Sequence, residues 1–278
     1  MVAALLALFS SIAGGAADFV GGTQTRQVSA LATIASSQCL GVALLIVWMA
    51  IERPSVGTDA FVPWAVLGGV TLLVGLGCFY QALATGTMSV VAPIAAVGVA
   101  VPFFWGLISG ERPGAIQVVG VLGVVIGVVL ASGPELRGQA GVRPIILAAV
   151  AGACFGSNMA FVAKAAQTDV LETMIVVKLT IIAPLLAYAF ARRTIGGLAQ
   201  ARWQLVVLLS LLDTCAILFF ALASRRGYIS VVSVLASLYP VVTVLLARVV
   251  HRERLRSSQN AGVVMSLTGI VLIVAGSS

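Results

Sequence analysis

Charged residues are scarce in this sequence. They make up 9% of its 278 residues, whereas an ordinary globular domain carries roughly 25%. Hydrophobic residues account for 60%, and the mean hydropathy is +1.14. So few charges cannot cover the surface of a water-soluble protein of this size. The composition therefore excludes a soluble enzyme, a secreted disulfide scaffold and a disordered chain, and it predicts an all-α membrane protein.

Residue patterns that carry common chemistries are missing as well. The sequence has one histidine, His251, and its four cysteines lie singly in apolar runs without the C-x-x-C spacing of a metal or redox site. No G-x-x-x-x-G-K-[ST] loop is present, so ATP-driven transport would need a separate subunit. We therefore expect no catalytic residue, no metal and no cofactor. An intramembrane enzyme and a channel are kept as alternatives from other functional classes.

The basic residues outnumber the acidic ones by 16 to 9, which gives a net charge of +7. They stand singly or in short groups between apolar runs, as is typical of loops that hold helix ends at the lipid headgroups. This distribution argues against nucleic acid as a partner and makes the lipid bilayer the expected surroundings.

Apolar runs separated by these charges predict ten transmembrane helices. A span needs about 20 mainly apolar residues, and residues 60–110, which carry no charge, are long enough for two spans and a turn. The Gly-rich and charged stretch at 131–144 is predicted to link two halves. The expected spans are residues 2–20, 29–51, 61–85, 88–109, 115–132, 144–166, 170–191, 202–224, 228–250 and 257–276.

The two halves resemble each other in sequence. ALATGTMSVVAPIA at 82–95 parallels ALASRRGYISVVSVLA at 221–236, and the Glu-Arg pairs that begin at Glu111 and Glu253 are 142 residues apart. We therefore predict two five-helix repeats, residues 1–133 and 144–278. Because five is odd, the second repeat would be inverted relative to the first. Inverted repeats form a site near the bilayer midplane that opens to alternate sides, so a carrier is favoured.

Several segments resemble the EamA-type, ten-span members of the drug/metabolite transporter superfamily. They are SVVAPIAAVGVAVPFFWGLISGERP at 89–113, FGSNMAFVAKA at 155–165 and SVVSVLASLYPVVTVLLARVVHRERL at 230–255. The resemblance implies a secondary carrier of small organic solutes, such as an exporter of metabolites or amino acids that works by alternating access. A drug or toxic-compound efflux carrier is the alternative, and both proton coupling and facilitated exchange are open.

The resemblance also implies a multi-pass protein of a bacterial-type inner or plasma membrane, for which a monomer and a homodimer both fit. Family members are usually drawn with cytoplasmic termini. With that orientation, five basic residues fall on the cytoplasmic side and ten on the other, so the positive-inside rule places the termini outside. The two arguments disagree, and the sequence leaves the orientation open.

Two charged residues lie deep inside expected spans. Asp213 is near the middle of its span, where a carboxylate costs about 2.5–3.5 kcal/mol on insertion scales. It is predicted to line the substrate path or to carry a coupling proton, and a structural ion pair is the alternative. Lys178 could pair with Asp213, bind a substrate carboxylate, or extend to the membrane surface.

Further polar and aromatic residues are weaker candidates for the substrate or coupling site. Asn158 lies mid-span among small residues, and Asp18, near the end of the first span, could instead be an interfacial carboxylate. Aromatic residues near span ends often belong to the interfacial belt instead. The remaining candidates are Tyr80, Gln81, Trp105, Tyr239 and Gln38.

Two short motifs are expected to be structural. Glu111 and Glu253 end their spans next to basic residues, and we predict that each pairs with local arginines at the headgroup level. Gly123 and Gly127 form a G-x-x-x-G motif, which predicts close packing of helices within the chain or at a dimer contact.

Overall fold

The computed structural model of the protein describes residues 2–24, 28–52, 59–85, 94–95, 97–131, 142–192, 201–251 and 257–276. Within these ranges every regular element is a helix. The first half contains α1 (Val2–Gln24), α2 (Ala30–Glu52), α3 (Val62–Thr85), α5 (Ala100–Ile108) and α6 (Ala115–Ala131). The short 3₁₀ turns η1 (Asp59–Phe61) and η2 (Val97–Val99) lead into α3 and α5.

The second half also begins with three long helices and continues with shorter ones. Its elements are α7 (Val142–Ala165), α8 (Val170–Arg192), α9 (Trp203–Ser224), α10 (Ile229–Ala236), α11 (Tyr239–His251) and α12 (Ser257–Ala275). The expected linker between the halves, apart from its ends, lies outside the described residues.

Six of the described helices are long and apolar enough to cross a membrane, namely α1, α2, α3, α7, α8 and α9. Four shorter apolar stretches lie where the fourth, fifth, ninth and tenth spans are expected: Val97–Ile108, Ala115–Leu130, Ile229–Thr243 and Asn260–Ile273. The all-helical membrane fold is therefore present, while the count of ten spans stays a prediction.

The ninth expected span is not one continuous helix. The structure divides it into α10 and α11, with a turn at Ser237 and Leu238. Pro240 follows this turn, and proline both lacks a backbone N–H and clashes with the carbonyl one turn earlier. The break therefore lies where the helical hydrogen bonds cannot continue. In the fourth expected span, residues 88–93 and Ala96 lie outside the described residues, and α5 is the regular part.

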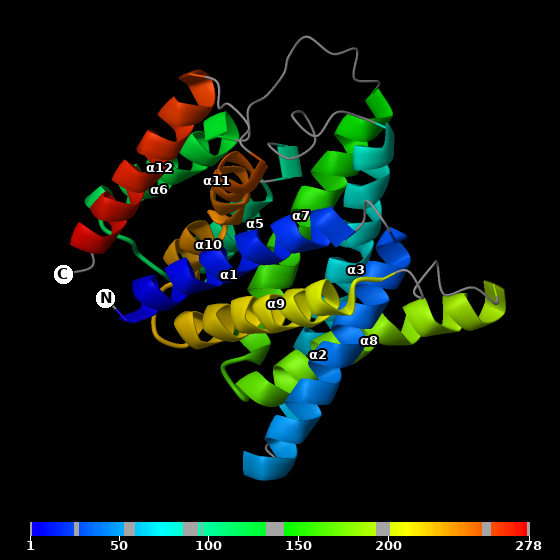
Figure 1. Cartoon of the computed structure of the whole chain (residues 1–278). Coiled ribbons are helices and arrows are strands. Elements are labelled where there is room, and N and C mark those ends of the chain that lie inside the picture. Colours follow the sequence, from blue (N-terminus) through cyan, green and yellow to red (C-terminus); the bar gives the residue numbers. More distant parts are fainter. Residues whose placement is uncertain are drawn as a thin grey trace.

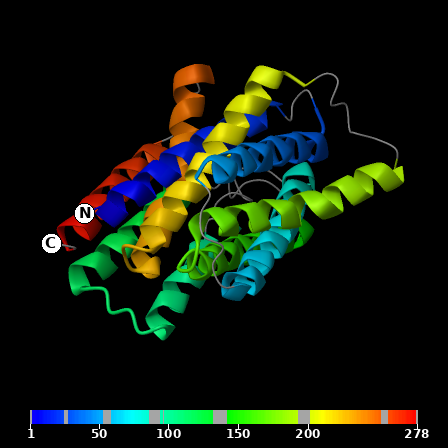
Figure 2. The same ribbon diagram turned by 90° about the horizontal axis from the view of Figure 1, so that it is seen from below.

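The helices pack in pairs that join the two halves. α1 lies along α9, α3 along α7, and α6 along α12, as seen in Figure 1. α2 crosses α8, and α5 contacts α10 near the middle of the molecule. The two termini lie near each other in both views (Figures 1 and 2).

Glycine allows α6 and α12 to pack with their backbones in contact. A Cβ atom on Gly120 would lie 2.7 Å from the carbonyl oxygen of Gly269, and one on Gly127 would lie 2.6 Å from the backbone nitrogen of Ser266. Gly123 also faces Gly269. The G-x-x-x-G motif therefore packs within the chain. In lipid, where apolar surface gains little from burial between helices, such close contact supplies much of the association.

Glu111 joins the end of α5 to the start of α10. Gly110 has a φ of +94°, and the backbone N–H of Glu111 donates to the carbonyl of Gly106 at 3.0 Å, which turns the chain back at the end of α5. The Glu111 carboxylate then accepts hydrogen bonds from the backbone N–H groups of Ile229 (2.6 Å) and Ser230 (2.9 Å), and from the Ser230 hydroxyl (2.6 Å).

A carboxylate at this place satisfies N–H groups that have no partner inside the helix, and it interacts favourably with the helix dipole. The acceptor role of Glu111 is thus structural, as expected, but its partner is the N-terminus of α10 rather than an arginine. Glu253 lies outside the described residues.

A first prediction concerns the contact between α6 and α12. Gly120→Ala places a methyl group against the backbone of α12 and should lower stability by about 1–3 kcal/mol. Gly77→Ala is the matched control, because a Cβ atom there meets nothing within 4 Å. The thermal midpoints of the two variants in detergent, followed by tryptophan fluorescence, test this. Equal midpoints would contradict the close backbone contact.

A second prediction concerns Glu111. Glu111→Ala leaves the start of α10 without its acceptor and should cost about 2 kcal/mol, which lowers the thermal midpoint. Glu111→Gln keeps one acceptor oxygen and should recover part of the loss. Arg112→Gln changes the exposed neighbouring residue and should leave the midpoint unchanged. A Glu111→Ala midpoint equal to that of Arg112→Gln would show that the cap does not stabilise the protein.

Candidate functional site

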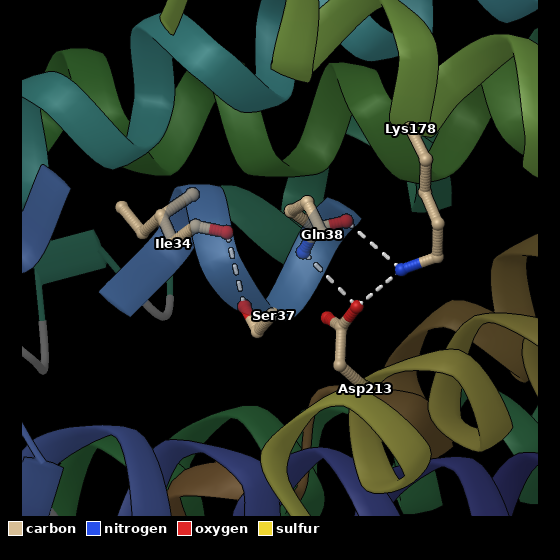
Figure 3. A network of polar contacts seen from close by, with 5 residues as sticks. All are labelled: Ile34, Ser37, Gln38, Lys178 and Asp213. Carbon is tan, nitrogen blue, oxygen red and sulfur yellow. Dashed lines mark hydrogen bonds and ion pairs between the residues drawn. The ribbon is translucent and has the colours of Figure 1, made fainter. Parts of the chain in front are cut away.

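Three side chains from three helices form a closed polar network (Figure 3). The Lys178 ammonium of α8 lies 2.6 Å from Oδ2 of Asp213 in α9, and it donates to Oε1 of Gln38 in α2 at 2.9 Å. The Gln38 amide nitrogen donates to the same Asp213 oxygen at 3.1 Å. The network therefore ties one helix of the first half to two helices of the second.

The two charged side chains of the network differ in how far they are buried. Lys178 has no exposed side-chain surface, whereas 28% of the Asp213 side chain is exposed. Asp213 follows the first residue of α9, Trp203, by ten residues, which is about 15 Å at 1.5 Å per residue. That distance is half the thickness of a hydrocarbon core of about 30 Å. The ion pair thus lies near the middle of its span with one partner accessible.

Gly41 leaves room for the lysine head group. A Cβ atom at this position would lie 3.1 Å from both Nζ of Lys178 and Oγ1 of Thr214. Any larger residue at this turn of α2 would press against the buried ammonium group. The glycine is therefore part of the site, because it lets the backbone of α2 pass beside the charge.

A cavity of about 150 Å³ lies beside this network. Its lining comes from both halves and is mostly apolar, with Ser10, Asn158 and Tyr239 as polar members. Ala216 and Ile217 of α9 line it one turn after Asp213, on the same side of the helix. The other lining residues are Gly14, Leu72, Met159, Val162, Val177, Phe220 and Ala236.

The polar lining residues are held by the partner helices. Ser10 of α1 donates to the carbonyl of Ala216 in α9 at 2.8 Å, and Asn158 of α7 donates through Nδ2 to the carbonyl of Gly68 in α3 at 2.8 Å. Both contacts join a helix of one half to a helix of the other. The cavity walls are therefore fixed by hydrogen bonds as well as by packing.

A second carboxylate faces the same region. Asp18 of α1 is exposed and lies near enough for its charge to repel that of Asp213 and to act on the hydroxyl of Tyr239. Ser10 and Gly14, which line the cavity, precede Asp18 by two turns and one turn on the same face of α1. This stripe on α1 continues the cavity wall toward the Asp213 carboxylate.

The structure brings together most of the predicted residues. Asp213 and Lys178 are paired, Asp18 lies near them, and Asn158 and Tyr239 line the adjoining cavity. Their roles stay predictions. The sequence did not single out Ser10, Gly41 or Thr214. Of these, only Ser10 could have been found from the sequence, because its four-residue spacing to Gly14 and then Asp18 places all three on one helix face.

Two predicted residues lie elsewhere, and a third cannot be placed. Trp105 of α5 packs against Trp64 and Phe161, with ring centroids 6.3 and 6.2 Å away, and it does not line the cavity. Gln81, near the end of α3, is exposed and is not a lining residue. The side chain of Tyr80 lies outside the described part of the chain.

Fold and site together define an integral, multi-pass helical membrane protein with a charged network beside a cavity lined by both halves. Residues 142–275 match the model of the EamA-like transporter family. This segment is just under half of the chain, and it is similar to the EamA-like transporters, a family of the drug/metabolite transporter superfamily. The match indicates a transporter of small solutes.

The overall fold has a counterpart among solved structures. A protein crystal structure is similar to this chain with a TM-score of 0.78 and 17% sequence identity, over 98% of this chain and 96% of its own. At this identity the likeness shows the fold alone. Among curated proteins, none matches the chain.

A third prediction tests the unequal burial of the ion pair. Asp213→Asn leaves the buried ammonium of Lys178 without a counter-charge and should cost about 3 kcal/mol. Lys178→Met leaves a carboxylate that is already partly exposed and should cost less. The double variant removes both charges and should be more stable than Asp213→Asn alone. Thermal midpoints of the four proteins in detergent provide the measurement. If the stability lost in the double variant equals the sum of the losses in the two single variants, the two side chains are not coupled.

Proposed function

We propose that the protein is a secondary carrier, built from two inverted five-helix repeats, that moves small organic solutes across the bilayer by alternating access. The observation that carries this proposal is the mid-span network of Lys178, Asp213 and Gln38 beside a cavity lined by both halves. Charged groups at this depth are costly, and in transporters they mark substrate or ion pathways.

The pairing of the helices supports the repeat. If each helix corresponds to the one five spans later, α1 corresponds to α7, and α3 corresponds to α9. The packing of α1 on α9 then has its counterpart in the packing of α7 on α3. The pairs α2–α8, α5–α10 and α6–α12 each join a helix to its own counterpart. A two-fold relation between residues 1–133 and 144–278 accounts for all five contacts.

The chemistry of the site favours a solute with a charged group and an apolar body. A substrate carboxylate could compete for Lys178, and a substrate ammonium could compete for Asp213. The apolar wall offers Met159, Val162 and Phe220 to the rest of the molecule. A cavity of about 150 Å³ suits a small metabolite such as an amino acid, and we propose export from a bacterial-type cell as the direction.

The same network supports our proposal that transport is coupled to protons. Protonation of Asp213 would remove the counter-charge of Lys178 and free the ammonium group for a substrate anion. Release of that proton would restore the ion pair and weaken substrate binding. The two states would differ in the charge that faces the cavity, which is what a coupled carrier requires. The runner-up is a drug efflux carrier, which the largely apolar lining favours.

A fourth prediction tests the transport function. Purified protein in proteoliposomes should show counterflow of at least one member of a panel of amino acids and related metabolites. An imposed pH gradient should drive accumulation of the same solute. Asp213→Asn should abolish the dependence on pH, because the amide cannot take up the proton.

The matched control is Asp169→Asn, which changes a carboxylate outside the network. Asp169 accepts the N–H of Glu172 at the start of α8, and asparagine caps helices equally well. This variant should transport like the unchanged protein. If a pH gradient still drives solute accumulation in Asp213→Asn, the coupling role of Asp213 is refuted.

A further inference from the structure

Among the described residues, six side chains have buried polar atoms without a hydrogen-bond partner, and four of the six lie on α1, α2 and α9. These four are Gln24 at the end of α1, Thr33 in α2, and Ser210 and Thr214 in α9. Gln24 and Ser210 have 0% of their surface exposed and Thr33 has 3%. Buried polar groups in proteins are almost always hydrogen-bonded, to the protein or to internal water. A group of four such side chains therefore calls for a physical explanation.

The four side chains lie on α9 and on α1 and α2, which both pack against α9. α2 and α9 run in the same direction, because a buried apolar cluster joins their first turns and the Gln38–Asp213 hydrogen bond joins them further along. Thr33 and Ser210 lie between these two contacts in sequence. The apolar cluster consists of Val28, Ala32, Ala201 and Val206.

The neighbours of Thr214 and Gln24 are known from packing contacts. Thr214 follows Asp213 directly, and its hydroxyl lies on the side of Gly41 and Lys178. Gly21 of α1 packs against Leu209, the residue before Ser210, and Gln24 lies one turn further along α1. Ser37, one turn after Thr33, also presents its hydroxyl on the side of α2 that faces Asp213 (Figure 3).

None of these four side chains lines the solute cavity. α2 contributes no residue to the cavity lining, whereas it supplies Gln38 to the network and Gly41 beside Lys178. The unpartnered polar residues of α9, Ser210 and Thr214, therefore differ from the α9 residues that line the cavity, Ala216, Ile217 and Phe220. Small hydroxyl and amide groups in a row are suited to binding water molecules, each of which needs two to four polar partners.

We propose that Gln24, Thr33, Ser210 and Thr214 line a hydrated seam between α2 and α9, the α2–α9 seam, through which protons reach Asp213 without passing through the solute cavity. The proposal rests on the carrier function proposed above. In the transfer, a hydrated proton is handed along hydrogen-bonded water molecules, and the last one protonates the Asp213 carboxylate. One O–H bond forms on Asp213 as one breaks on water, and the ion pair with Lys178 is lost.

Two charged groups face Asp213, and one of them is a second carboxylate. Lys178 faces Asp213 from α8 and Asp18 from α1. The other helices packed on α9 carry charges only at their ends, namely Glu52 in α2 and Arg143 and Lys164 in α7, while α10 carries none. Tyr239 of α11 is close to Asp18. The seam itself contains only neutral side chains, so it conducts protons without competing for them.

A fifth prediction separates proton access from solute movement. In proteoliposomes, Thr33→Val and Ser210→Ala, singly and combined, should keep solute counterflow at equal pH on both sides. The same variants should lose accumulation driven by a pH gradient, down to simple equilibration. The controls are Thr268→Val and Ser11→Ala, whose hydroxyls bond to carbonyls of their own helices. Both controls should keep both activities.

Failure of the seam proposal and failure of the carrier function give different results. Variants of the α2–α9 seam that accumulate solute like the controls would overturn the proposal, and so would an equal loss of counterflow and accumulation. Absence of counterflow in the unchanged protein would instead refute the proposed carrier function.

A solute-free measurement tests the seam in that case as well. Infrared difference spectra after a jump to acid pH in lipid follow protonation of Asp213, with Asp213→Asn to assign the band. Protonation should be slower in the combined Thr33→Val and Ser210→Ala variant than in the unchanged protein, and equal rates would overturn the proposal.

Discussion

The arrangement of the central helices depends on the burial of one ammonium group. Lys178 is fully enclosed, so its charge needs a counter-ion and further acceptors inside the protein. Asp213 and Gln38 supply these from α9 and α2, and Gly41 leaves the space. The three helices therefore meet in one register, in which the carboxylate is level with the ammonium group. The cavity residues Ala216 and Ile217 follow Asp213 by one turn, and Asp18 lies close to it.

Packing elsewhere follows a different rule. In lipid, apolar helices gain little from burial against each other, so association relies on close contact and hydrogen bonds. α6 and α12 associate through glycine and serine at their contact, and α1 and α7 each donate a side-chain hydrogen bond to a helix of the other half. The molecule thus combines a polar centre with a tightly packed helix pair at its edge.

Much of the fold could be predicted from the sequence because span length and hydropathy are local properties. The charge-free runs indicated helices where the structure has them. Pro240 indicated a point of interruption in the ninth expected span. Its full division into two helices could not be predicted, because proline kinks some spans and divides others depending on neighbouring packing. Asp213 and Lys178 stood out because charges are rare in spans. The role of Gln38 could not be read, because it depends on a contact across 175 residues of chain. The same holds for Glu111, whose partner is a helix end 118 residues away.

The Glu111 cap has a mechanical consequence. Its carboxylate holds the first turn of α10 through three hydrogen bonds, although Glu111 belongs to the first half and α10 to the second. While these bonds last, α10 cannot slide or rotate independently of the end of α5. Two rigid halves that rocked against each other would have to break them in every cycle. Otherwise α5 and α10 travel together as a unit, and the boundary between moving parts runs through each half rather than between the two.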